Sequence, residues 1–152
     1  MVAETFNDLV GNTPLVRYAT DEVPGCRFWV KLEGYNPTGS VKDRGCLNYI
    51  LDAKEKGGLS PSQTLLDASS GNMACALAYF GRVLGHPVEV VCGSKLTDDK
   101  AAFIKYFGAK LTMVGDFTIQ GNEHCRDVIQ PSDPEQYYFL DQLHNWANPG
   151  AH

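Results

Sequence analysis

The sequence lacks the features that mark membrane-spanning, secreted and nucleic-acid-binding proteins. Its 152 residues hold no run of about 18 apolar residues, so we expect no membrane-spanning helix. The first residues have neither a basic flank nor an apolar core, so we expect no signal peptide. A net charge of −5 disfavours nucleic acid, whose partners usually carry a basic patch. We therefore expect a cytoplasmic protein without nucleic-acid or membrane partners.

Paired cysteine motifs are missing as well. The five cysteines are odd in number and widely spaced, at positions 26, 46, 75, 92 and 125, and no Cys-x-x-Cys occurs. This pattern indicates free, mostly buried thiols rather than a disulfide framework. His124 and Cys125 are neighbours, but two adjacent side chains do not make a metal site, so we expect no bound metal.

The chain does contain a regular alternation of short apolar runs with segments of helical spacing, in a length typical of one domain. The apolar runs predict strands over residues 13–18, 27–32, 64–67, 88–92, 110–114 and 137–140. The other segments predict helices over 41–56, over 71–84, from Thr97 to Gly108, and over 119–129 before Pro131.

Local signals support two of these helices. Gly57 and Gly58 end the first, because glycine tolerates the left-handed cap position. Thr97 is a suitable N-cap for the third, and the acidic residues that follow it complement the helix dipole. The spacing predicts that the first helix buries one side and that the third buries two aromatic rings; the residues concerned are Cys46, Leu47, Ile50 and Leu51, and Ala102, Phe103 and Phe107.

Strand and helix alternation with short connections predicts an α/β fold, a three-layer open parallel sheet with helices on both faces, in a single domain over 1–152. Ligands of such sheets bind beyond the carboxyl ends of the strands. The chemistry is therefore expected in two loops that each leave a strand and enter a helix, over residues 34–42 and 68–73.

The first loop is dense in turn residues and ends at a lysine. Ser40 can cap the following helix, which places Lys42 in the first helical turn. A cation there opposes the helix dipole, and this field, together with burial, favours the neutral, nucleophilic amine. A lone lysine at such a position is otherwise a solvated surface residue.

The whole string from Lys31 to Arg44 resembles the pyridoxal phosphate (PLP) lysine motif of the cysteine synthase family, the O-acetylserine sulfhydrylases. The family pattern is Lys-x-Glu-x-x-Asn-Pro-x-Gly-Ser-x-Lys-Asp-Arg, and the matching residues are Lys31, Glu33, Asn36, Pro37, Gly39, Ser40, Lys42, Asp43 and Arg44. The resemblance implies the N-terminal domain of a fold-type II PLP enzyme. It also implies that Lys42 is the catalytic Schiff-base lysine and the base that removes the substrate α-proton.

The second loop reads Ser69-Ser70-Gly71-Asn72-Met73 and opens a helix, whose free N–H groups suit an anion. Taken alone, such a string is commonly a turn with a cap. It resembles the family loop Thr-Ser-Gly-Asn-Thr-Gly, which implies that Asn72 binds the 3′-oxygen of the cofactor. Ser69, Ser70, Gly71 and Met73 would then hold the α-carboxylate of the substrate. Met73 and Ala74 depart from the family's threonine and glycine, so we expect a bulkier and more apolar pocket there.

Both ends of the chain also resemble the family. Gly11-Asn12-Thr13-Pro14-Leu15 matches a stretch whose expected role is a turn before a strand. The tail resembles Gln-Phe-x-Asn-x-x-Asn-x-x-x-His, which implies that Gln142 reaches the substrate carboxylate. The resemblance further implies that residues 1–35 and 141–152 pack with a larger domain in relatives.

The resemblance covers this chain but only about half of a family enzyme. A Gly-Thr-rich phosphate loop is missing from the sequence, and Gly93, Gly115 and Gly121 are too isolated to form one. The family implies PLP-dependent β-replacement on an O-activated serine, a small amino-acid substrate, homodimers and a missing C-terminal half. The alternative is a truncated, non-catalytic relative that binds an amino acid or a partner. Turnover by the assembled protein distinguishes the two.

Overall fold

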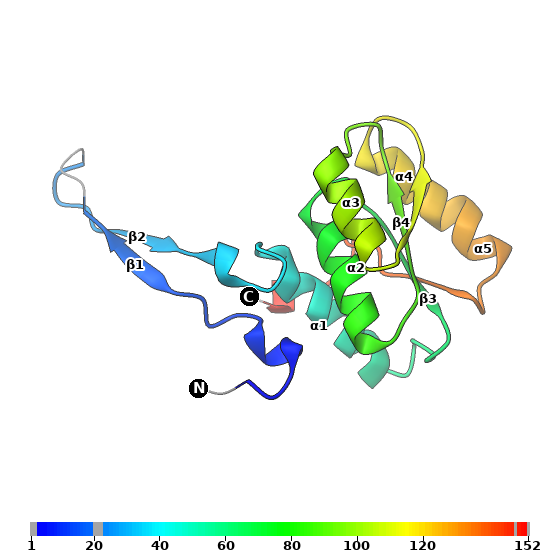
Figure 1. Ribbon diagram of the computed structural model, residues 1–152, viewed down its shortest axis with the longest axis horizontal. Helices are drawn as coiled ribbons and strands as arrows, with labels where there is room; N and C mark the ends of the chain where they lie inside the picture. The colour runs from blue at the N-terminus through cyan, green and yellow to red at the C-terminus, as the bar shows by residue number, and fades with distance from the viewer. Residues whose placement is uncertain (1–2, 20–22, 148, 152) are drawn as a thin grey trace.

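A computed structural model of the chain describes residues 3–19, 23–147 and 149–151. An N-terminal arm, which carries the strands Leu15–Tyr18 and Phe28–Lys31, projects from a compact α/β body (Figure 1). The elements are η1 (Phe6–Leu9), β1 (Leu15–Tyr18), β2 (Phe28–Lys31), η2 (Glu33–Tyr35), α1 (Lys42–Glu55), β3 (Thr64–Ala68), α2 (Asn72–Leu84), β4 (Val88–Cys92), α3 (Asp98–Tyr106), β5 (Lys110–Met113), α4 (Thr118–His124), η3 (Cys125–Ile129), α5 (Gln130–Ser132), β6 (Tyr137–Phe139) and η4 (Pro149–Ala151).

The body is built on a four-stranded parallel sheet in the order β5-β4-β3-β6. Leu65 of β3 pairs with Val88 of β4, and Leu66 pairs with Phe139 of β6. All five residues of β3 and all five of β4 are buried. Such continuously buried strands are typical of a parallel sheet that is covered on both faces.

Neighbouring residues of these strands belong to two different cores. Leu65 and Val90 lie in the larger cluster, together with residues of α1, α2 and α3. Leu66 and Val91 lie in a smaller cluster with Cys125 of η3. Because successive side chains of a strand point to opposite faces, helices cover both sides of the sheet (Figure 1). The predicted three-layer α/β architecture is confirmed.

Some details of the helices differ from the prediction. Leu51 of α1 is 42% exposed, and Ala102 of α3 is exposed while Ile104 is fully buried. The predicted buried faces were therefore wrong at those two positions, because helix spacing alone does not show which edge of a face meets the sheet. The fourth helix continues through η3 into α5, past Pro131. Pro131 lies in the last turn of this continuous helix, which ends at Ser132.

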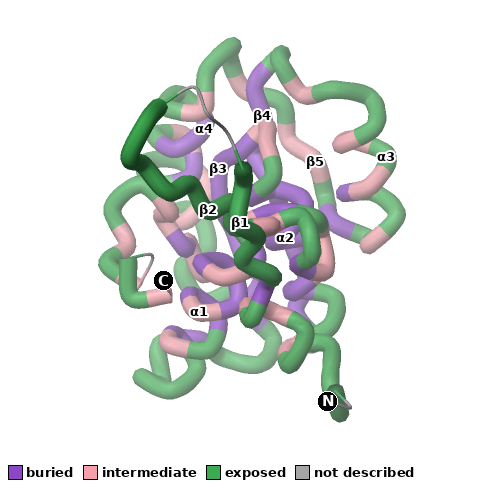
Figure 2. The backbone as a smooth tube through the Cα atoms, turned by 90° about the vertical axis from the view of Figure 1, so that its left-hand side faces the viewer, coloured by how far each residue is buried: buried purple, intermediate pink, exposed green. Residues whose placement is uncertain are grey.

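The first two strands do not join the parallel sheet, so the prediction of one parallel sheet was wrong for them. β1 and β2 pair with each other in antiparallel orientation, with Val16 opposite Val30 and Tyr18 opposite Phe28. An antiparallel pair needs no crossover helix. Every residue of both strands is exposed and is coloured accordingly in Figure 2, and Figure 1 shows the hairpin extending away from the body.

The cysteines agree with the sequence prediction. Cys26 is exposed, the other four are buried, and all five are free thiols. Within the described part of the chain, no helix has the length and apolar character needed to cross a membrane.

Gly81 marks the closest approach of α2 to the sheet. A Cβ at this position would overlap Cγ2 of Val88 and lie 3.6 Å from Cδ1 of Leu65. We expect Gly81→Ala to lower the free energy of unfolding by about 1–3 kcal/mol through overpacking, although alanine is the better helix former. Denaturant unfolding measures this loss. Val88→Ala in the same background should restore part of it, and an unchanged stability of Gly81→Ala would contradict the expectation.

Candidate active site

The two predicted loops meet at one edge of the sheet. α1 precedes β3 and α2 follows it, and both helices run antiparallel to the strand. Both therefore begin near the carboxyl end of β3, and they pack against each other. Cys46 of α1 is fully buried between the loops. Burial raises the pKa of its thiol, and the nearby carboxyl groups of Asp67 and Asp43 add to that effect. Asp43 lies in the first turn of α1, just after the lysine loop (residues 34–42), and Asp67 lies just before the serine loop (residues 69–73), so Cys46 is close to a carboxyl group beside each loop.

The lysine loop is folded around a buried carboxyl group. The backbone N–H of Thr38 donates to Oδ2 of Asp43 at 2.6 Å, and the Thr38 hydroxyl donates to Oδ1. Asp43 is fully buried; burial raises its pKa, and the bonds from Thr38 oppose this. Ser40 Oγ accepts the N–H of Lys42 at 3.2 Å, although Val41, and not the predicted Ser40, is the N-cap residue of α1. These contacts fix the start of α1.

Lys42 is the first residue of α1, as predicted, but its side chain is exposed. The burial that we expected of it is therefore not found in this chain. The next residue, Asp43, takes the inward position of that turn, and consecutive helical residues point in different directions. Lys42 consequently lies on the solvent-exposed side of the first turn of α1.

A network centred on Glu33 holds the lysine loop to the N-terminal arm. Arg44 makes a two-pronged ion pair with Glu33, with Nε 2.8 Å from Oε2 and Nη2 2.9 Å from Oε1. The Thr13 hydroxyl donates to Oε1 at 2.6 Å, and Nδ2 of Asn36 donates to Oε2 at 2.8 Å. These groups, Arg44 first, lower the pKa of Glu33 to about 2. No local sequence pattern indicated that Glu33 and Arg44 pair with each other.

The Gly11–Leu15 stretch forms a turn that leads into β1, as predicted. Gly11 and Asn12 both have positive φ, 85° and 46°. The N–H of Gly11 donates to Oδ1 of Asn36 at 2.9 Å. A Cβ at Gly11 would lie 2.9 Å from Nη1 of Arg44. The turn therefore closes against the Glu33 network.

The serine loop (residues 69–73) is anchored by hydrogen bonds to its two serine side chains, and these bonds leave the serine O–H groups free to donate. Ser69 Oγ accepts the N–H of Gly71 at 3.2 Å, and Ser70 Oγ accepts the N–H of Gly93 at 3.0 Å. A hydroxyl that accepts can still donate its own hydrogen. Asn72 opens α2 and is exposed. The first N–H groups of a helix have no intrahelical partner and suit an anion.

Met73 and Gln142 are the remaining predicted site residues. The Met73 side chain is 3% exposed and packs in the main core, so the residue contributes its backbone N–H at the start of α2. The predicted apolar pocket at this position stays a prediction. Nε2 of Gln142 donates to the carbonyl of Ala68 at 2.7 Å, which brings the tail beside the serine loop.

The isolated glycines offer no phosphate cradle in this chain. A Cβ at Gly93 would lie 2.9 Å from the backbone of Asp116, and one at Gly115 would overlap the Gln120 amide. A Cβ at Gly121 would lie 3.2 Å from Ala68 Cβ. At each of these glycines, atoms of the same chain already fill the space beside Cα. The described residues therefore include a lysine amine that could bond PLP and N–H and hydroxyl donors that could hold a substrate carboxylate. Among these residues, none of the three glycines forms a site for the PLP phosphate.

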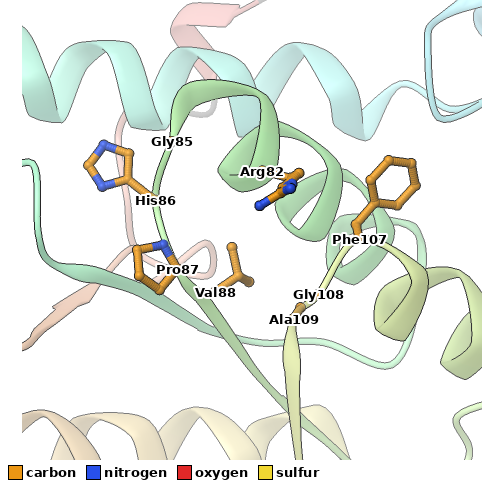
Figure 3. A pocket seen from close by; sticks show the side chains of 8 residues that line it. All are labelled: Arg82, Gly85, His86, Pro87, Val88, Phe107, Gly108 and Ala109. Carbon is orange, nitrogen blue, oxygen red and sulfur yellow. The ribbon is translucent and has the colours of Figure 1, made fainter.

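A cavity of about 350 Å³ lies at the other edge of the sheet, where β4 and β5 begin (Figure 3). It is lined by Arg82, Gly85, His86, Pro87, Val88, Phe107, Gly108 and Ala109. Nδ1 of His86 is 3.2 Å from the carbonyl oxygen of Gln63, and burial lowers the pKa of His86. This cavity is separate from the two loops. The described residues include no group of three or more metal-ligating side chains.

Comparison with known proteins gives consistent matches. The family described as "PALP: Pyridoxal-phosphate dependent enzyme" matches residues 6–152. Cysteine synthase of Aquifex aeolicus (strain VF5) is 41% identical over 157 residues, which cover 98% of this chain and 47% of that protein. Cysteine synthase B of Pseudomonas syringae pv. syringae is 37% identical over 153 residues, covering 98% of this chain and 88% of that protein.

The fold comparison agrees with the sequence matches. The crystal structure of an O-ureido-L-serine-bound mutant of O-ureido-L-serine synthase has a TM-score of 0.89 and 30% identity. The match covers 100% of this chain and 47% of that one. The chain spans about half the length of most curated relatives it matches. It belongs to the pyridoxal-phosphate dependent enzymes, and it corresponds to the N-terminal half of their cysteine synthase family.

Proposed function

We propose that the chain supplies the lysine-bearing half of a PLP-dependent enzyme that replaces the β-substituent of an O-activated serine. One observation carries the proposal: Lys42 and the serine loop open α1 and α2 at the same edge of the sheet. The names of the matched relatives, cysteine synthase and O-ureido-L-serine synthase, supply the reaction class.

The serine loop binds and orients the amino acid. The hydroxyl groups of Ser69 and Ser70 and the N–H groups around Gly71 and Met73 receive the α-carboxylate. Gln142 donates one amide hydrogen to Ala68, and its second amide hydrogen remains for the same carboxylate. Asn72, exposed at the start of α2, would bind the 3′-oxygen of the cofactor. Holding the carboxylate fixes the direction of the Cα–H bond.

Lys42 provides the reactive amine. It is the exposed first residue of α1, so its side chain is accessible to a cofactor and a substrate. A neutral amine can bond the cofactor and can accept the proton from Cα of the substrate. PLP, when bound, supplies an electron sink for the charge that this proton leaves at Cα. The phosphate site is contributed by the second half of the enzyme.

Turnover of O-acetyl-L-serine tests this function. The assembled enzyme, supplied with PLP, O-acetyl-L-serine and sulfide, should release acetate and form cysteine. The chain alone should bind PLP only weakly, because it has no phosphate cradle. Binding of O-acetyl-L-serine without turnover by the assembled enzyme would favour a non-catalytic binding domain instead.

The N-terminal arm is proposed as the docking surface for that second half. Val16, Tyr18, Phe28 and Val30 share one face of the β1–β2 hairpin, and all four are 39–59% exposed. The chain exposes 9001 Å² at a mass of 16.7 kDa, whereas a compact protein of this mass exposes about 7,600 Å². The excess of about 1,400 Å² is larger than the roughly 800 Å² that one partner commonly contributes to a stable interface.

Fragment complementation tests the docking surface. We expect Val30→Asp to weaken association with the second half at least about tenfold, because it places a charge in an apolar contact. Arg17→Asp is the matched control, since Arg17 lies on the opposite face of the same hairpin. Co-purification of tagged chain with the second half measures both variants. Equal effects of the two substitutions would contradict the assignment of the apolar face.

A further inference from the structure

A histidine close to Gln142 lies against a carboxyl group. Nδ1 of His144 is 2.9 Å from Oδ1 and 3.1 Å from Oδ2 of Asp141. The backbone N–H groups of His144 and Asn145 donate to the Asp141 carbonyl at 3.0 and 2.9 Å, so a tight turn brings the pair together. Asp141 has a φ of 48°, and a residue with a Cβ keeps this left-handed conformation only where its surroundings hold it.

A buried amide holds the other side of the same carboxyl group. Asn122 of α4 is fully buried, and its Nδ2 donates to Oδ1 of Asp141 at 3.0 Å. The next residue along the chain, Gln142, is tied to the serine loop through the carbonyl of Ala68 at 2.7 Å. The Asp141 carboxyl group is therefore fixed between α4 and the ring of His144.

This carboxyl group determines which ring nitrogen of His144 carries a hydrogen. An ionised carboxylate can only accept hydrogen bonds, so Nδ1 is the donor of the pair. In the neutral ring, Nε2 then keeps a lone pair. The His144 side chain is 61% exposed, so the ring is accessible to a ligand. A neutral imidazole that a carboxylate orients in this way is suited to act as a general base.

The ring of His144 also borders a cavity. The cavity has a volume of about 380 Å³, and its lining residues are Gln142, Leu143, His144, Asn145, Trp146 and Pro149. Sites for small molecules commonly have volumes of about 300–1,000 Å³. Leu143 is 49% exposed and Trp146 is 89% exposed, so two large apolar side chains accompany the imidazole. The cavity therefore suits a small molecule that has an apolar part and one acidic hydrogen.

We propose that His144 is a catalytic base that activates the second substrate of the reaction, a neutral thiol with an apolar or aromatic substituent. This role rests on the proposed function, in which Gln142 holds the carboxylate of the first substrate. Gln142 lines the same cavity as His144, so a thiol in the cavity lies beside that amino acid. The exposed indole of Trp146 offers the substituent a flat apolar surface.

The proton and electron balance of this step needs no oxidant or reductant. Acetate leaves O-acetyl-L-serine with the electron pair of its bond to Cβ, and Lys42 takes the proton from Cα. Nε2 of His144 then takes the S–H proton as an electron pair of sulfur forms the new bond to Cβ. The Asp141 carboxylate stabilises the resulting imidazolium. Lys42 returns its proton to Cα, and the exposed ring of His144 releases the thiol proton to solvent.

Steady-state kinetics of the assembled enzyme with PLP and O-acetyl-L-serine test this role. Phenylmethanethiol and hydrosulfide serve as alternative nucleophiles. His144→Gln should lower kcat/KM for phenylmethanethiol by about 10²-fold, because such a thiol is mostly protonated near pH 7 and needs a base. Hydrosulfide is already an anion, so its kcat/KM should change much less. The substituted side chain is exposed, so we expect the variant to fold.

Two further variants serve as controls. His124→Gln is the matched control, because His124 lies on α4 and is not among the lining residues of the cavity. It should keep the wild-type values for both nucleophiles. Asp141→Asn suits the left-handed backbone at this position, but it places an amide donor where a carboxylate oxygen was. It should lower kcat/KM for phenylmethanethiol in the same direction as His144→Gln, by a smaller factor.

The position of the ring hydrogen gives a readout that does not depend on turnover. Long-range ¹H–¹⁵N spectra of the assembled enzyme, with only this chain ¹⁵N-labelled, assign the hydrogen of a neutral histidine ring to one nitrogen. The wild type should carry it on Nδ1 of His144, and Asp141→Asn should move part of the population to Nε2. A wild-type ring with its hydrogen on Nε2 would overturn the proposal.

Release of acetate in the absence of a nucleophile tests the proposed function separately. A wild type that releases no acetate would overturn the reaction class and the role of His144 together. A wild type that releases acetate and uses hydrosulfide but not phenylmethanethiol would overturn only the assigned class of nucleophile and its base. The same follows if His144→Gln keeps the wild-type kcat/KM for phenylmethanethiol, or loses activity equally with both nucleophiles.

Discussion

Replacement of Lys42 by alanine should abolish turnover in the assembled enzyme while leaving the fold intact. The side chain is exposed at the first turn of α1, so its truncation removes few contacts. Such surface substitutions change the free energy of unfolding by less than about 0.5 kcal/mol. Loss of a general base alone lowers a rate by about 10²–10⁴-fold. Steady-state formation of cysteine from O-acetyl-L-serine and sulfide measures the effect.

The absorption of bound PLP gives an independent readout of the same variant. A covalent link to Lys42 should produce an absorption band near the visible edge, and Lys42→Ala should lose it. Lys56→Ala is the matched control, because Lys56 lies at the other end of α1 with its amine 2.8 Å from Asp52. A band retained in Lys42→Ala would contradict the assignment of the lysine.

Local sequence patterns predicted the elements of the body well, and the arm less well. β4 was placed at Val88–Cys92 without error, since its apolar run is bounded by a proline and a glycine. The same kind of pattern identified β1 and β2 as strands but carried no information about their partner. Strand direction is set by the connection, and the described part of the segment between these two strands, residues 19 and 23–27, contains no helix.

The site shows a similar division. The motif placed Lys42 and Asn72 at helix starts, because turn residues and caps act over a few positions. It could not show that Glu33 meets Arg44 and Thr13, which lie 11 and 20 residues away. The exposure of Lys42 and the burial of Asp67 depend in the same way on how distant segments pack. Long-range contacts of this kind are absent from any local pattern.

Glu33→Gln should produce the largest loss of stability among substitutions at the lysine loop. The wild-type carboxylate accepts bonds from Arg44, Thr13 and Asn36, and glutamine removes the charge while keeping the shape. Lowering of the Glu33 pKa to about 2 corresponds to an upper limit of about 3 kcal/mol. We expect about 1–3 kcal/mol at pH 7, because both side chains keep some exposure to solvent.

The pH dependence of this loss has a definite sign. The folded-state pKa of Glu33 is depressed, so its contribution is complete above the ordinary value of 4.5 and is lost as the pH falls toward about 2. The difference in unfolding free energy between the wild type and Glu33→Gln should therefore be constant from about pH 5 to 8 and shrink below that range. Urea unfolding at a series of pH values measures it.

An exposed ion pair provides the control for Glu33. Asp52 pairs with Lys56 on the surface of α1 at 2.8 Å, and Asp52→Asn should cost less than about 1 kcal/mol. Arg44→Lys keeps the positive charge but loses the two-pronged geometry, so it should fall between the two variants. A Glu33→Gln loss no larger than that of Asp52→Asn would show that the Glu33 network does not hold the lysine loop to the arm.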